Sequence, residues 1–171
     1  DFPILEDSIE SNYLEIKSKY LLKILNKTKF SISNDETRHY LNGVYLHKTE
    51  EENPKLVGVA TDGHRLSKTQ ISLDEDKSFY PVILPKKTVF EIINIISEEG
   101  DTPIKIISER SKIKFIIKDI ILISKVIDGK FPDYERVIPK DSRKEVKAKV
   151  ADFVSAVDGI KSLSLDRKGV I

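Results

Sequence analysis

The chain contains no cysteine, and this absence removes two kinds of site at once. Neither a disulfide framework nor a thiolate metal site can form, which fits a reducing compartment. The three histidines, His39, His47 and His64, do not have the spacing of a metal-binding pair. We therefore expect no bound metal ion and no cofactor.

Long apolar runs are also missing. No stretch approaches the length of a membrane span and no signal peptide is recognisable, so we expect a soluble, cytoplasmic protein without a membrane partner. Hydrophobic residues make up 39% of the 171 positions, enough for a core in one domain, or in one domain plus part of another. The formal net charge of +1 does not indicate an acidic partner, so any electrostatic argument depends on where the charges lie.

The apolar pattern predicts an α+β fold in which two helices pack on antiparallel sheets. Ser18 is the predicted N-cap of a helix over 19–31, and a second helix over 86–97 follows Pro85 and closes at Gly100. The segment 128–139 contains two prolines and cannot be a central strand. The predicted strands are Tyr13–Lys17, Tyr40–Lys48, Leu56–Thr61, Leu66–Leu73, Tyr80–Leu84, Ile104–Ser108, Ile113–Lys118 and Ile121–Ile127.

Several short patterns recur along the chain at nearly constant spacing, which indicates a duplicated domain. Because the chain begins with Asp1 and stops where a strand pattern starts, we expect it to be a piece of a longer protein. The recurring pairs are Phe2-Pro3 with Phe131-Pro132, strand 13–17 with Val146–Val150, the helix at 21–25 with one at 153–157, and Asn42-Gly43-Val44 with Lys168-Gly169-Val170.

The segment Thr61–Leu66 has the composition of a hairpin turn, with an Asp-Gly pair between two strand patterns. Asp62 and His64 could share a face as an acid–base pair, because residues i and i+2 of an extended segment do so. The sequence supplies no nucleophile or second histidine at a useful spacing, which disfavours catalysis. Two other interpretations stay open: a plain surface turn, or a ledge that presents Arg65 and Leu66 to a partner.

Basic residues are placed on one side of both predicted helices. Lys19, Lys23 and Lys27 form a row without an acid in the same helix, an arrangement suited to phosphate contacts or simply to solvation. The second helix starts with Lys86-Lys87, where the helix dipole disfavours cations. Arg38-His39-Tyr40 could also contact nucleic acid, with Tyr40 stacking on a base.

Two long motifs carry a family resemblance. Val59-Ala60-Thr61-Asp62-Gly63-His64-Arg65-Leu66 and the segment from Asp128 to Pro139, DGKFPDYERVIP, together resemble the beta subunit of bacterial DNA polymerase III, the sliding clamp. Arg38-His39-Tyr40-Leu41-Asn42-Gly43 and Val82-Ile83-Leu84-Pro85-Lys86-Lys87 resemble the same family in order and distance.

The resemblance implies a non-catalytic subunit of a DNA-directed DNA polymerase, a transferase. Members are homodimeric rings of three similar domains per subunit that encircle duplex DNA without reading its sequence. Here 1–10 would end the first domain, 11–139 would form the middle domain, and 140–171 would begin the third.

By the same resemblance, a groove beside the middle domain receives short linear motifs from the polymerase catalytic subunit, the clamp loader and repair polymerases. The residues that match this groove are Leu41, Thr61, Gly63, His64, Arg65, Leu66, Pro132, Arg136 and Val137. The residues expected to face DNA are Lys19, Lys23, Lys27, Arg38, His39, Tyr40, Lys86 and Lys87. The alternatives are an Asp/His-dependent nuclease or hydrolase, and a peptide-binding scaffold with no role on DNA.

Overall fold

The computed structural model describes residues 13–74, 76–140 and 144–163, in two compact units, Asp1–Pro132 and Asp133–Ile171. The expectations for Phe2-Pro3, for segment 1–10 and for Lys168-Gly169-Val170 lie outside the described residues. In the part that is described, no helix is long and apolar enough to cross a membrane.

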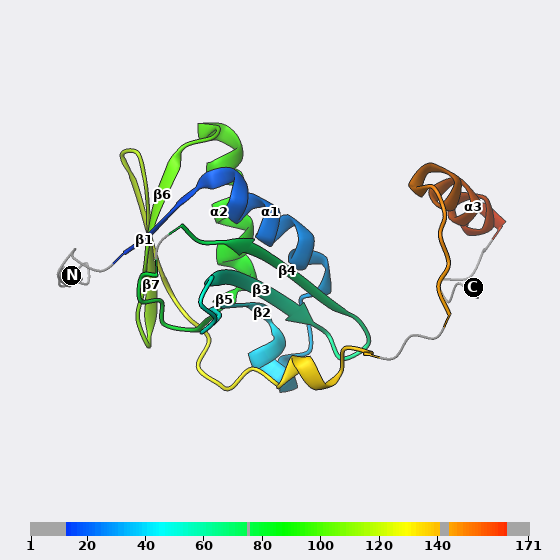
Figure 1. Ribbon diagram of the computed structural model, residues 1–171, viewed down its shortest axis with the longest axis horizontal. Helices are drawn as coiled ribbons and strands as arrows, with labels where there is room; N and C mark the ends of the chain where they lie inside the picture. The colour runs from blue at the N-terminus through cyan, green and yellow to red at the C-terminus, as the bar shows by residue number, and fades with distance from the viewer. Residues whose placement is uncertain (1–12, 75, 141–143, 164–171) are drawn as a thin grey trace. The chain divides into compact units, whose positions relative to one another are not determined.

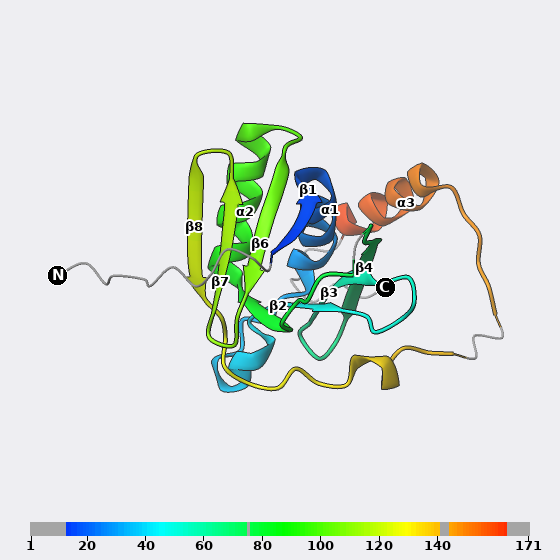
Figure 2. The ribbon, with the colours of Figure 1, turned by 60° about the vertical axis from the view of Figure 1, so that its left-hand side comes forward.

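The first unit contains two four-stranded sheets, and both are antiparallel, which confirms the predicted antiparallel pairing (Figures 1 and 2). One sheet has the order β1-β6-β7-β8, with bounds Leu14–Lys17, Pro103–Ser108, Lys112–Ile117 and Ile120–Lys125. The other has the order β4-β3-β2-β5, with bounds Leu66–Ser72, Lys55–Thr61, Gly43–Lys48 and Val82–Pro85. In β1 the alternation is clean: Leu14 and Ile16 are buried while Glu15 and Lys17 are exposed.

Two helices complete this unit. α1 (Ser18–Thr28), which continues into the short 3-10 helix η1 (Lys29–Ser31), packs on β3, β4 and α2. Gly58 allows the close approach of α1 to β3, because a Cβ at this position would lie 2.3 Å from Ile24 Cγ2. α2 (Lys86–Glu99) starts directly after Pro85, as predicted, and runs two residues past the predicted end, with Gly100 at its C-cap. One continuous apolar core joins both sheets and both helices.

The predicted N-cap role of Ser18 is wrong. Lys17 occupies the N-cap position and α1 begins at Ser18 itself. The fully buried Ser18 hydroxyl donates to the Gly100 carbonyl at 2.9 Å and accepts from the Thr102 amide at 2.9 Å. These two hydrogen bonds therefore join the start of α1 to the loop between α2 and β6.

The predicted strand Tyr40–Lys48 is too long, because its first residues are helical and the strand begins only at Gly43. A 3-10 segment, η2 (Glu36–Leu41), precedes β2. Asp35 starts it, because its Oδ1 accepts a hydrogen bond from the Thr37 amide at 2.9 Å. Leu41 is buried at the end of η2, so its apolar character reflects packing rather than a strand.

The second unit contains η3 (Tyr134–Arg136) and α3 (Val150–Leu163). The predicted strand Val146–Val150 is wrong, because 146–149 form no regular element and Val150 starts α3. A strand needs a partner: β1 pairs with β6 much further along the chain, whereas the described residues of the second unit include no strand. The helix expected at 153–157 is confirmed within α3.

Candidate functional site: a hairpin ledge and a lysine face

The tip of the β3–β4 hairpin is a tightly bonded turn. Asp62 Oδ1 accepts hydrogen bonds from the amides of His64 (2.9 Å) and Arg65 (3.0 Å). Thr61 Oγ1 accepts from the Gly63 amide (3.1 Å) and donates to the Arg65 carbonyl (2.8 Å). Gly63 has a φ of 90°, a conformation that favours glycine. The residues Thr61–Leu66, which we call the ledge, are therefore held in a defined shape before any partner arrives.

The acid–base hypothesis for Asp62 and His64 finds no support here. Hydrogen bonds from the backbone amides of Arg65, the larger cause, and of His64 hold the pKa of Asp62 at about 2. Asp62 Oδ2 also accepts a hydrogen bond from Arg65 Nε at 3.1 Å. The carboxylate is therefore ionised and committed to its own turn. Across the described ranges, no hydrogen bond joins the His64 ring to a carboxylate, and no three His or acidic side chains gather as metal ligands.

Arg38 links the ledge to η2. Its Nε donates to Asp35 Oδ2 at 2.8 Å, and its Nη2 donates to the Asp62 carbonyl at 3.3 Å. The guanidinium also lies against Gly63, where a Cβ would come within 2.7 Å of Nη1. Hydrogen bonds from Thr37 and Arg38 hold the pKa of Asp35 at about 2, so this ion pair is formed at neutral pH. Arg38 was expected to face DNA, and its ion pair with Asp35 was not predicted, although the Asp-x-x-Arg spacing of the two residues was a signal for it.

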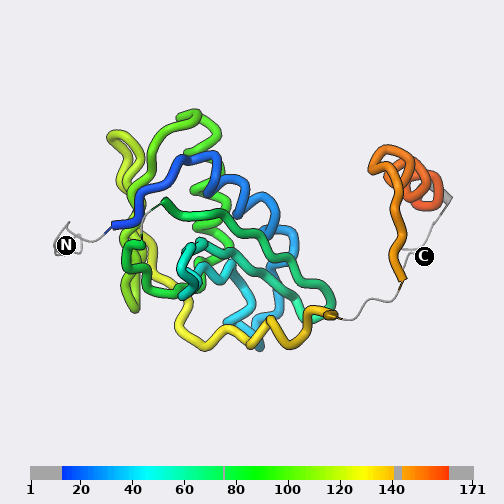
Figure 3. The backbone as a smooth tube through the Cα atoms, in the orientation of Figure 1, coloured from blue at the N-terminus to red at the C-terminus, as the bar shows by residue number. Residues whose placement is uncertain are grey.

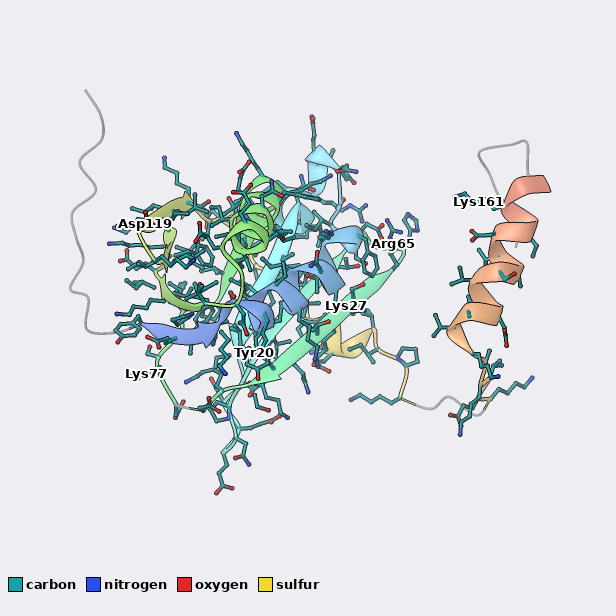
Figure 4. All side chains as sticks on the ribbon, turned by 90° about the horizontal axis from the view of Figure 1, so that it is seen from above. Tyr20, Lys27, Arg65, Lys77, Asp119 and Lys161 are labelled. Atoms are coloured by element: carbon teal, nitrogen blue, oxygen red, sulfur yellow. The ribbon has the colours of Figure 1, made fainter. Side chains whose placement is uncertain are left out.

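The other predicted groove residues of the first unit gather near the ledge. Leu66 starts β4 opposite Thr61 and is half-buried, and Arg65 projects from the hairpin tip (Figure 4). Leu41 lies at the end of η2, the segment that Arg38 joins to the ledge. The hairpin thus places the aliphatic side chain of Leu66 next to the hydrogen-bonded polar groups of the ledge, and Arg38 connects the ledge to η2.

The segment that follows β8 runs past η2 at Gly129, as Figure 3 shows. A Cβ on Gly129 would lie 3.1 Å from Tyr40 Cβ, and the Phe131 ring stacks on Tyr45 with centroids 4.9 Å apart. Pro132 follows directly and is exposed. Arg136 and Val137 belong to the second unit, where Arg136 Nε pairs with Asp133 at 2.7 Å, so their place beside Leu66 stays a prediction.

The lysine row on α1 is exposed, as expected, but it is not free of acids. Lys19 Nζ lies 3.0 Å from Asp101 Oδ2, in the loop between α2 and β6, so an acid from outside the helix pairs with the row at this position. The hydrogen bond from Lys19 lowers the pKa of Asp101, and the same bond raises the pKa of Lys19. Within the described residues, Lys23 and Lys27 form no ion pair.

The remaining residues expected to face DNA lie on two other segments. Lys86 Nζ donates to Asn34 Oδ1 at 2.6 Å, and Lys87 is exposed beside it at the start of α2. On η2, His39 is exposed and its ring meets that of Tyr40 nearly edge-on, with centroids 5.9 Å apart.

Solved structures that resemble this chain include bacterial DNA polymerase sliding clamps. A clamp from Bacillus subtilis superposes with a TM-score of 0.88 at 28% identity, covering 98% of this chain and 43% of that one. A DnaN clamp from Bartonella birtlesii, solved bound to griselimycin, superposes with a TM-score of 0.87 at 38% identity, covering 98% and 45%.

The sequence comparisons agree. Residues 15–133 match the DNA polymerase III beta subunit, central domain. The Beta sliding clamp of Caulobacter vibrioides is 38% identical over 169 residues, covering 98% of this chain and 45% of the relative, and that of Escherichia coli K12 is 34% identical over 148 residues, covering 86% and 39%. The chain belongs to the DNA polymerase III beta subunit family, the beta sliding clamps, which confirms the resemblance. It spans less than half the length of these relatives.

Proposed function

We propose that this chain forms the central part of a DNA replication processivity factor, a ring that encircles duplex DNA and tethers the replicative polymerase. In this proposal 1–10 end a first domain, 11–139 are the middle domain and 140–171 begin a third, and two subunits close the ring. The observation that carries the proposal is the preorganised ledge on a domain of sliding-clamp fold, with a lysine-bearing helix in the same unit.

The lysines provide the DNA contact. Exposed ammonium groups on α1 and at the start of α2 contact phosphates without reading bases, so the ring can slide along any sequence. His39 and Tyr40 add an aromatic pair on η2. The DNA-facing set is Lys19, Lys23, Lys27, Arg38, His39, Tyr40, Lys86 and Lys87, in which Arg38 contributes only the donors that its bonds to the ledge leave free.

The ledge provides the partner contact. The residues proposed to contact the apolar anchor of a short linear motif are Leu41, Leu66, Pro132 and Val137, and those proposed to donate to its polar groups are Arg65 and Arg136. The occupants are segments of the polymerase catalytic subunit, the clamp loader and repair polymerases. Since griselimycin binds the Bartonella relative, we propose that it also binds the clamp that contains this chain.

The mechanism is tethering rather than catalysis. A polymerase bound to a ring on its template rebinds as an intramolecular event, which raises its effective concentration without new chemistry. The Asp62 carboxylate is hydrogen-bonded to the backbone and to Arg65 of its own turn, so the ledge offers no assembled Asp62–His64 acid–base pair for a hydrolase mechanism.

The test of this function is retention on closed DNA. A subunit containing this chain, placed by a clamp loader on nicked circular duplex, is expected to stay bound during gel filtration and to be released when a restriction enzyme linearises the circle. Equal retention on circular and linear DNA would contradict the topological link.

A further inference from the structure

The loop between α2 and β6 brings one carboxylate to the lysine row. Lys19 Nζ and Asp101 Oδ2 are 3.0 Å apart. The loop is held in place by Ser18, whose amide donates to the Thr102 carbonyl at 2.7 Å and whose hydroxyl bonds to Gly100 and Thr102. The Ser18 hydroxyl also donates to Asp101 Oδ1 at 3.4 Å, so the Asp101 carboxylate is held by its loop and by Ser18, while Lys19 reaches it by a flexible stem.

The Lys19–Asp101 ion pair contributes little to the stability of the fold, so a phosphate can compete with Asp101 for Lys19. Both side chains are about half exposed, 51% for Lys19 and 47% for Asp101, and ion pairs of this kind add little to stability and are screened by salt. The neighbouring acid Glu99 pairs instead with Lys118 at 2.7 Å. Asp101 therefore acts on Lys19 specifically among the described lysines of α1.

We propose that Asp101 is an intramolecular competitor of DNA phosphate at Lys19, which withholds one of the three α1 cations and keeps the hold on duplex DNA loose. The inference rests on the proposed DNA-facing role of α1. A looser hold suits a protein that must slide, because each phosphate contact adds to affinity and to its salt dependence.

The experiment compares Asp101→Asn with the unaltered chain. Asparagine keeps the shape and removes the charge, so Lys19 becomes free to contact a phosphate. We expect the affinity for a 5′-fluorescein 20-base-pair duplex, measured by anisotropy between 50 and 200 mM NaCl, to rise about two- to five-fold at the low-salt end. The slope of log K against log salt is expected to steepen by about 0.9, one further phosphate contact.

Lys19→Gln in both backgrounds completes the test. In the unaltered chain this change is expected to have less than about a two-fold effect, because Lys19 is already withheld, whereas in the Asp101→Asn background it should remove the whole gain. Glu98→Gln, a neighbouring change of the same charge without a lysine partner, should leave the slope unchanged.

Lys23→Gln separates the two proposals. If Lys23→Gln weakens binding while Asp101→Asn leaves the slope unchanged, the competitor role is wrong and the DNA-facing role stands. If neither Lys23→Gln nor any change at Lys19 or Asp101 affects binding, α1 does not face DNA and both proposals fail.

Discussion

Reversing two charges on α1, Lys23→Glu together with Lys27→Glu, is expected to lower the affinity for duplex DNA by about a hundred-fold at 50 mM salt. Both side chains are exposed and form no ion pair among the described residues, so they are available to phosphates. The change removes two contacts and adds repulsion, and the salt slope should become shallower by about 1.8, or 0.9 per contact. The apolar stripe of α1 faces the core, so the fold should be retained.

The matched control is Lys105→Glu with Lys125→Glu. These exposed lysines lie on β6 and β8, and replacing them changes the net charge by the same amount without altering α1. Fluorescence anisotropy of the same duplex should show less than about a three-fold loss for the control. Equal losses in the two double variants would mean that net charge, and not the α1 face, determines DNA binding.

Replacing Gly63 by alanine is expected to weaken binding of a linear-motif peptide at least about ten-fold. Gly63 has a φ of 90°, and the new Cβ would lie 2.7 Å from Arg38 Nη1. The turn or Arg38 must therefore move, which breaks the link between η2 and the ledge. Strain of this kind costs about 1–3 kcal/mol, which should also appear in the free energy of unfolding.

The variant Gly100→Ala is a control that distinguishes the general effect of backbone strain from an effect on peptide binding by the ledge. Gly100 also has a positive φ, of 75°, but a Cβ there meets no atom within 4 Å, and it lies at the end of α2 rather than in the ledge. Urea unfolding should show a comparable loss for both variants, while isothermal titration with the peptide should show weak binding only for Gly63→Ala. If both variants bound the peptide equally well, the shape of the ledge would be irrelevant to docking.

Local periodicity was enough to predict most of the fold. The alternation of Leu14, Glu15, Ile16 and Lys17 predicted β1, and the apolar stripe of α1 predicted its buried face, because both patterns report directly which side meets the core. The strand predicted at Val146–Val150 failed because strand formation depends on a partner that periodicity does not reveal.

The structure of the candidate site could be predicted only where its interactions are local in the sequence. Thr61–Leu66 was recognisable because its turn chemistry is contained in six consecutive residues. Two other contacts join residues far apart in the sequence and are visible only in the folded chain. Arg38, which was expected to face DNA, donates to the Asp62 carbonyl and supports the ledge. Lys19, which was also expected to face DNA, is paired with Asp101. The role of Ser18 was missed because its partners, Gly100 and Thr102, are equally distant.

The ledge as a docking surface is tested most directly at Leu66. The affinity of a fluorescein-labelled linear-motif peptide from the replicative polymerase is measured for the unaltered chain, for Leu66→Ala and for Ile121→Ala, an exposed aliphatic residue on β8 that serves as the control. Removing the half-buried Leu66 side chain at the start of β4 should weaken binding at least about ten-fold, while Ile121→Ala should leave it unchanged. Equal affinity of Leu66→Ala and the unaltered chain would contradict the assignment of this ledge as the docking site.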